Sequence, residues 1–186
     1  MRKFDFRCVV VSHGDVGFPH LESLKKSNVG LEVNTVVSQG TRGMFPNCDR
    51  NVYDWVCNNK NKLSKRILFL EYDTRIETDL RTVFSKSYGD MEGACVYTLT
   101  NYPSQFMYCM EAKKLPSNLI PTAMLFAPLG MFMLSVNAAK YLSSDDHRGV
   151  FDIDMDSEVR LPSVVRGGGF TIAENPALTH VRCRKT

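Results

Sequence analysis

Two carboxylates, one residue apart, follow directly on an apolar run in the stretch RILFLEYDT. Glu71 and Asp73 come after the four apolar residues 67–70 and flank a single tyrosine. Side chains two apart in an extended chain point the same way, so both carboxylates can face one hard cation that neutralises a diphosphate. The alternative is that Asp73 and Thr74 begin a turn and Glu71 makes a surface ion pair.

A second acidic cluster, in FDIDMDSEV, contains a candidate general base. Asp156, Ser157 and Glu158 stand where a helix is expected to begin. A general base must lie within hydrogen-bond reach of the hydroxyl that it deprotonates. We assign this role to Glu158, with Asp156 as the second candidate. Acids in a first helical turn also complement the helix dipole, so capping is the alternative. Asp152 and Asp154 are expected to be solvated.

Short apolar runs alternate with helical patterns in the first half of the chain. This alternation is typical of βαβ units, which form a largely parallel sheet. The apolar run before Glu71 has almost no polar residue, so we expect helices on both faces of its strand. The sequence predicts strands at 7–12, 31–37 and 66–70, and helices at 18–26 and 49–58, with Asp49 as N-cap.

The second half has a looser pattern with the same kinds of element. The segment 105–115 fits a helix and a strand equally well. The other expectations are a helix behind Thr78, a strand at 94–100, a strand running into a helix within 130–144, a short helix from Asp156 or Ser157 that the glycines 167–169 end, and a strand at 170–176. The predicted fold is a three-layer α/β/α sandwich with a mostly parallel central sheet, in a single domain of residues 1–186.

Composition excludes several classes of protein. A net charge of +3 is too small for a bulk electrostatic interaction with nucleic acid. Six cysteines without a CxxC pair favour a reduced, intracellular setting over a disulfide framework. We find no signal-peptide pattern, and the apolar stretch AMLFAPLGMFMLSV is interrupted by Pro128 and Gly130. We therefore expect a soluble, cytoplasmic protein without a transmembrane segment.

The triplet Glu71-Tyr72-Asp73 resembles the DxD motif of GT-A nucleotide-sugar glycosyltransferases. It ends an apolar strand that follows two predicted βα units and a helix containing CDRNVYDW. In that class the two acids hold Mn²⁺ or Mg²⁺ against the diphosphate of the sugar nucleotide. Glu71 departs from the motif, whereas Asp73 matches its last position. The resemblance implies metal-dependent, inverting transfer from a UDP- or GDP-sugar to a hydroxyl of a glycan or another acceptor.

The same resemblance assigns further residues to the nucleotide. The loop SHGDVGFP follows the first strand, where the class recognises the nucleoside, and it offers Ser12, His13 and Asp15. Arg50 and Asn51 resemble the basic and amide residues near the nucleotide in several such families. The alternatives are an ordinary βα turn, whose glycines serve the backbone, and a solvated helix face.

The C-terminal region completes the implied site. The class often closes its metal site with a C-terminal histidine or acid, and His180 occupies such a position. A nitrogen ligand suits Mn²⁺ better than Mg²⁺. Arg182, Arg184 and Lys185 then screen the departing diphosphate, with the chain from about Asn175 folded over it. The resemblance divides the domain into a nucleotide-binding half, about 1–90, and an acceptor and catalytic half, about 91–186. The alternative for His180 is simple exposure.

Two other functions compete with this one. The stretch LEYDT also resembles the DxDxT loop of haloacid-dehalogenase-like phosphatases. That chemistry needs an aspartate nucleophile, usually on the first strand, whereas Glu71 stands on the third predicted strand. The other alternative is a non-catalytic module that binds nucleotide without turnover.

Overall fold

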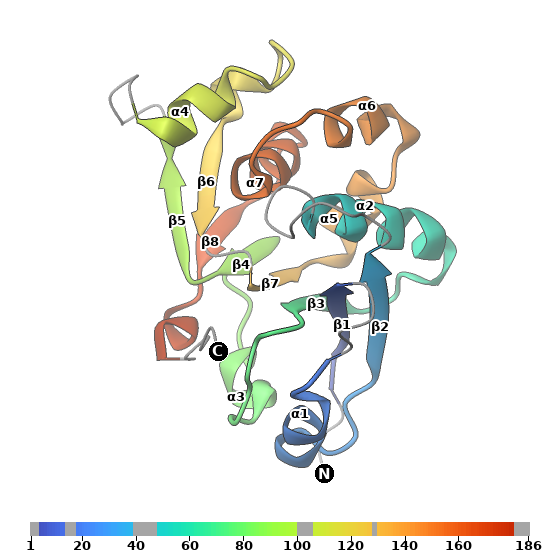
Figure 1. Ribbon diagram of the computed structural model, residues 1–186. Coiled ribbons are helices and arrows are strands. Elements are labelled where there is room, and N and C mark those ends of the chain that lie inside the picture. Colours follow the sequence, from blue (N-terminus) through green and yellow to red (C-terminus); the bar gives the residue numbers. More distant parts are fainter. Residues whose placement is uncertain (1–3, 14–17, 39–47, 100–105, 128–129, 181–186) are drawn as a thin grey trace.

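A six-stranded sheet in the order β2-β1-β3-β7-β4-β8 forms the centre of the protein (Figure 1). The computed structural model describes residues 4–13, 18–38, 48–99, 106–127 and 130–180, and for a few of them, His13 and His180 included, only the backbone. The strands are β1 (Phe6–His13), β2 (Val33–Ser38), β3 (Arg66–Glu71), β4 (Met91–Gly93), β7 (Met131–Leu134) and β8 (Ile172–Glu174).

Strand β7 is the one strand of this sheet that runs against the others. β1 pairs in parallel with β2 and β3, and β4 pairs in parallel with β8. β7 lies between β3 and β4 and is antiparallel to both. The predicted mostly parallel sheet is therefore confirmed, and β1, β2, β3, β4 and β8 all end at the same edge. Both halves of the chain contribute strands to it.

Helices cover both faces of the sheet, which confirms the three-layer prediction (Figure 1). Ile67 and Phe69 of β3 pack with the helices of one face, and Leu68 and Leu70 pack with those of the other. Alternate strand residues point to opposite faces, so this apolar run needs cover on both sides. The first face carries α2 (Cys48–Asn59), α5 (Val136–Leu142) and α7 (Ser157–Gly167), and the second carries α1 (Leu21–Ser27) and α3 (Leu80–Val83).

A second, two-stranded sheet stands beside the first. β5 (Cys95–Thr98) pairs antiparallel with β6 (Met124–Ala127), and α7 packs against β6. The strand predicted at 94–100 is confirmed, whereas β6 was not predicted. The remaining elements are α4 (Met107–Ala112), α6 (Arg148–Phe151) and the 3₁₀ helices η2 (Lys60–Lys62), η4 (Ile120–Thr122), η5 (Asp145–His147) and η6 (Pro176–His180).

Helix ends follow the capping chemistry of the sequence in two places out of three. Asp156 caps α7, as predicted, and Gly169 after the helix has a φ of +81° that favours glycine. Asp79, rather than Thr78, caps α3. The prediction that Asp49 caps α2 is wrong. Asp49 is the second residue of that helix, and its carboxylate is buried in an ion pair with Arg160.

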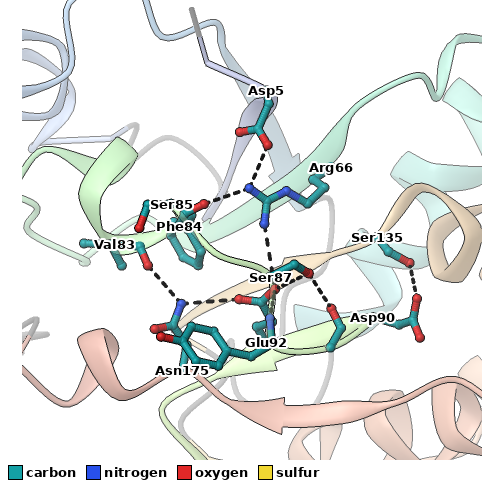
Figure 2. Close-up of polar contacts among 12 residues, drawn as sticks. Asp5, Arg66, Val83, Phe84, Ser85, Ser87, Asp90, Glu92, Ser135 and Asn175 are labelled. Atoms are coloured by element: carbon teal, nitrogen blue, oxygen red, sulfur yellow. Dashed lines mark hydrogen bonds and ion pairs between the residues drawn. The ribbon is translucent and has the colours of Figure 1, made fainter. Parts of the chain in front are cut away.

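A buried carboxylate on β4 anchors the chain that follows β8 (Figure 2). Glu92 is fully buried, and its oxygens accept hydrogen bonds from Ser87 Oγ (3.0 Å) and Asn175 Nδ2 (3.3 Å). The Asn175 amide also donates to the carbonyl of Val83 (3.1 Å). Arg66 Nη1 lies 3.8 Å from the same carboxylate. The start of the C-terminal segment is thus part of the folded core.

A second carboxylate of this region predicts a dependence of stability on pH. Asp90 accepts hydrogen bonds from Ser135 Oγ (2.9 Å) and from the hydroxyl and N–H of Thr171 (2.9 and 3.1 Å). Burial raises the pKa of Asp90, but these hydrogen bonds outweigh it and the net pKa lies below 3.8. An acid whose pKa is lower in the folded state than in the unfolded state stabilises the folded protein at pH values above the pKa of the unfolded state. This stabilisation is lost as the pH falls through the pKa of the folded state.

Asp90→Asn is therefore expected to flatten the loss of stability on acidification below about pH 4. At neutral pH the variant should be less stable by about 1–2 kcal/mol, because it weakens hydrogen bonds to a charged acceptor. Urea unfolding between about pH 7 and pH 3 measures both effects. The exposed Asp154, changed to Asn, serves as control. Parallel pH profiles for Asp90→Asn and the parental protein would contradict the assignment.

Candidate functional site

Glu71 is the last residue of β3 and lies at the edge where the parallel strands end. It stands opposite Val11 of β1, and the next N–H, that of Tyr72, donates to the Val11 carbonyl (3.0 Å). The Glu71 N–H donates to the carbonyl of Gly130, just before β7 (2.9 Å). The two neighbouring strands therefore hold the backbone of the predicted motif. In open α/β sheets, ligands bind at this edge.

Glu71 ends β3, and Tyr72 and Asp73 lie in a turn that the N–H of Thr74 closes on the carbonyl of Glu71 (3.0 Å). A turn at this point was the alternative to an extended acidic pair. Tyr72 packs against the cluster that contains the residues of α1 and α3. Cys48, the first residue of α2, is buried close to both acids. Burial and then the nearby negative charges, those of Glu71 and Asp73 among them, raise the pKa of Cys48. Both acids are partly exposed and face the first turn of α2.

The second pair of acids stands at the start of α7, beside α4. Asp156 Oδ1 accepts the N–H of Glu158 (2.8 Å), and the N–H of Asp156 donates to Glu111 Oε2 (2.9 Å). Burial is the main cause that raises the pKa of Asp156. Glu158 Oε2 accepts a hydrogen bond from the hydroxyl of Tyr108 (3.3 Å). Capping therefore accounts for Asp156, whereas the carboxylate of Glu158 extends toward α4.

A buried ion pair connects α2 with α7. Asp49 and Arg160 are both 0% exposed, with Nε to Oδ2 at 2.7 Å and Nη2 to Oδ1 at 2.5 Å. The first turn of α2, which lies close to Glu71, is thereby held against the first turn of α7, which carries Asp156 and Glu158. The two predicted groups of acids come from residues far apart in the chain, and the structure joins them through this contact.

Arg50 pairs with the end of α6. Its Nη1 lies 2.8 Å from Asp152 Oδ1, and both side chains are about half exposed. Exposed pairs of this kind contribute about 0–1 kcal/mol, so a ligand anion can displace the carboxylate at little cost. Asn51, the next residue of α2, is partly buried. Asp152, expected to be merely solvated, is thus an ion-pair partner, while Asp154 is exposed as expected.

The predicted nucleoside loop lies mostly outside the described residues. Ser12 is 1% exposed, and its hydroxyl donates to the carbonyl of Val36 on β2 (3.4 Å). This hydroxyl is withdrawn from ligands, so we leave Ser12 out of the ligand set proposed below. His13 ends β1, with only its backbone described, and Asp15 falls outside the described ranges.

His180 ends η6, which begins at the same edge of the sheet as Glu71. β8 leads into η6 and runs parallel with β4, in the direction of β3. The side chain of His180 is not described. Within the described part of the chain no three or more His, Cys, Asp or Glu side chains are grouped to hold a metal. Glu71 and Asp73 therefore need further ligands to complete a site.

The segment after β8 begins as core. Asn175 is 0% exposed and Leu178 is 3% exposed, and Leu178 packs in the cluster on the α3 side. The expectation that the chain folds over the diphosphate from about Asn175 is therefore wrong for Asn175 and Leu178, which are core residues.

Sequence reasoning missed two residues that lie beside the predicted acids. Cys48 gives no signal in the sequence, because it is a single cysteine between Asn47 and Asp49 that forms no recognisable motif with them. Tyr108 lies in the segment whose periodicity fits a helix and a strand equally. The same ambiguity left no indication that Met107 and Met110 are 59% and 57% exposed.

Comparisons with known proteins are sparse. The chain matches no family profile and no curated protein sequence. A solved structure of an active-site mutant of LgtC is similar to 90% of this chain, over 72% of its own, with 12% sequence identity and a TM-score of 0.49. A similarity at this level carries no weight for function. In the described residues, no helix has the length and apolar character needed to cross a membrane.

Proposed function

We propose that this protein is a metal-dependent glycosyltransferase that moves a sugar from a UDP- or GDP-sugar to a hydroxyl acceptor. The observation that carries the proposal is the pair Glu71 and Asp73, both partly exposed and both close enough to act on Cys48 of α2, at the ligand-binding edge of the sheet. Two partly exposed carboxylates at this edge suit a hard divalent cation that still needs oxygens from its ligand. A diphosphate supplies such oxygens.

The proposed metal ligands are Asp73 directly, Glu71 directly or through water, and His180. Carboxylate oxygens suit both Mn²⁺ and Mg²⁺, and the imidazole nitrogen favours Mn²⁺. When bound, the ion neutralises the negative charge that develops on the departing diphosphate. His13, Asp15, Arg50 and Asn51 are the proposed contacts to the nucleotide. Tyr72 contributes through its backbone position between the two acids, because its ring packs on the far side of the sheet.

Glu158 is the proposed general base. It accepts the proton of the acceptor hydroxyl as the acceptor oxygen bonds to the anomeric carbon of the donor. The bond from that carbon to the diphosphate oxygen breaks, and the nucleoside diphosphate leaves with the bonding electrons. Attack from the face opposite the leaving group inverts the anomeric configuration. The hydrogen bond from Tyr108 holds the Glu158 carboxylate in place. Asp156 is the alternative base.

A panel of UDP- and GDP-sugars, screened for thermal stabilisation with and without Mn²⁺, tests the proposal. A ligand that binds only the folded protein raises its melting temperature by mass action. We expect one donor to stabilise strongly and only with the metal, and to release its nucleoside diphosphate slowly with water as acceptor. Stabilisation without release of UDP or GDP would favour the non-catalytic module. No metal-dependent stabilisation by any donor would remove the proposal.

His180→Ala is expected to weaken Mn²⁺-dependent UDP binding by about 10-fold or more, because it removes a proposed metal ligand. The melting temperature of the ligand-free protein should not change. Asn175→Ala serves as the contrasting variant, since Asn175 bonds to Glu92 and Val83 in the core. It should lower the melting temperature instead. Calorimetric titration and thermal unfolding give both quantities. Unchanged UDP affinity in His180→Ala would exclude the histidine from the metal site.

A further inference from the structure

The ion pair of Asp49 and Arg160 takes no part in the proposed chemistry, although it lies close to the proposed site and is fully buried. Both side chains are 0% exposed, and two N–H groups of the guanidinium reach the two carboxylate oxygens. Nη1 of Arg160 donates to the carbonyl of Ile153. The guanidinium also lies over the ring of Phe151, 5.7 Å from its centroid.

Stability alone does not explain an ion pair in this place. The surroundings are apolar, with Val52 on α2 and Val159 and Leu161 on α7 all buried. Removing two charges from water is costly, and an apolar pair of similar volume often stabilises a protein as well or better. An arginine and a carboxylate joined by two parallel hydrogen bonds do offer a fixed geometry that an apolar pair lacks.

The ion pair fixes the relative position of the two groups of proposed functional acids. On one side, α2, which carries Asp49, packs on β3 through Trp55, whose ring meets that of Phe69 edge to face at 5.7 Å between centroids, two residues before Glu71. On the other side, the N–H of Arg160 donates to the carbonyl of Asp156 (3.0 Å), the residue that caps the helix carrying Glu158. Contacts therefore run without interruption from β3, through α2, to the start of α7.

We infer that Asp49 and Arg160 are positioning residues that hold the proposed general base in register with the proposed metal-binding acids. The inference rests on the proposed function. Neither side chain contacts the substrate, because both are sealed from solvent. Donor binding depends on the end of β3 and on Arg50 and Asn51 of α2, which Trp55 holds on β3 without the pair, whereas transfer also needs α7 in place. A displacement of about 1 Å between reacting groups can cost about 10²-fold in rate. Loss of the pair should therefore affect turnover more than donor affinity.

The test replaces the pair by apolar side chains of similar size, in the double variant Asp49→Leu with Arg160→Met. The single variant Arg160→Met leaves a buried carboxylate without its partner, and its melting temperature should fall by about 10 °C. The double variant should melt within about 3 °C of the parental protein, because the apolar pair fills the same space. The exposed pair Glu22 and Lys25 on α1, changed to Gln and Met, is the control and should alter nothing.

Three measurements on the full chain then decide the inference. They are the affinity for UDP with Mn²⁺, the rate of UDP release from the stabilising donor with water as acceptor, and hydrogen exchange of the amides of residues 158–160. In the double variant we expect parental UDP affinity, a kcat lower by about 10-fold or more with little change in KM, and faster exchange at the start of α7.

The outcomes separate this inference from the proposed function. UDP release at the parental rate by a stably folded double variant would overturn the inference alone. A parallel loss of affinity and rate would also overturn it, because the pair would then shape the donor site itself. If the parental protein shows no metal-dependent binding of nucleotide, the proposed function fails. Hydrogen exchange still tests the pair in that case, and unchanged exchange at residues 158–160 would overturn its positioning role.

Discussion

Asp73→Asn is expected to lower the affinity for UDP in the presence of Mn²⁺ by about 100-fold or more. The substitution keeps the size of the side chain and removes the negative charge that a hard cation requires. Asp73 is partly exposed at the end of β3, where the neighbouring strands hold the backbone. The melting temperature of the ligand-free protein should therefore stay the same. Calorimetric titration of Mn²⁺ and UDP measures the affinity.

Two further variants show whether the effect belongs to this carboxylate. Asp154→Asn removes one negative charge from an exposed position elsewhere, and it should bind as the parental protein does. Glu71→Gln should give a smaller loss than Asp73→Asn, because Glu71 is proposed only to assist the metal, directly or through water. Equal affinity of Asp73→Asn and the parental protein would contradict a metal site at the end of β3.

Glu158→Gln is expected to reduce the rate of sugar transfer by about 10²–10⁴-fold and to leave donor affinity nearly unchanged. Glutamine accepts the hydrogen bond from Tyr108 as glutamate does, so the side chain should stay in place. It cannot accept the proton of the acceptor hydroxyl. Nucleoside diphosphate release under saturating donor measures the rate, and titration with UDP and Mn²⁺ measures the affinity.

Asp156→Asn is the matched variant for this experiment. Asparagine is as good an N-cap as aspartate, so the start of α7 should hold and any loss of rate would be chemical. If Asp156→Asn slows sugar transfer and Glu158→Gln does not, the general base is Asp156. If neither variant loses the rate and the product retains the anomeric configuration of the donor, neither side chain acts as the base and the proposed mechanism is wrong.

Most helices and strands could be predicted from residue types and their spacing. The apolar run of β3 could be read without its partners, because four consecutive buried side chains need cover on both faces. The helix α7 was readable at both ends, since Asp156 before it and the glycines after it have strong local preferences. The position of Glu71 at the end of β3 also followed from the chain alone, whereas the two-residue repeat of an extended strand does not reach Asp73, which lies in the turn after it.

The contacts between side chains from distant parts of the chain could not be predicted and are seen only in the folded protein. β7 runs antiparallel to both of its neighbours, β3 and β4. Local propensity does not encode the direction of a strand, so this orientation could not be predicted. Asp49 has the residue type and position of an N-cap, yet its carboxylate is paired with Arg160, 111 residues away. Ser12 stands where a loop residue would meet a ligand, but packing buries its hydroxyl against the carbonyl of Val36 on β2. Such contacts depend on which surfaces face each other after folding, and residue type and spacing do not carry that information.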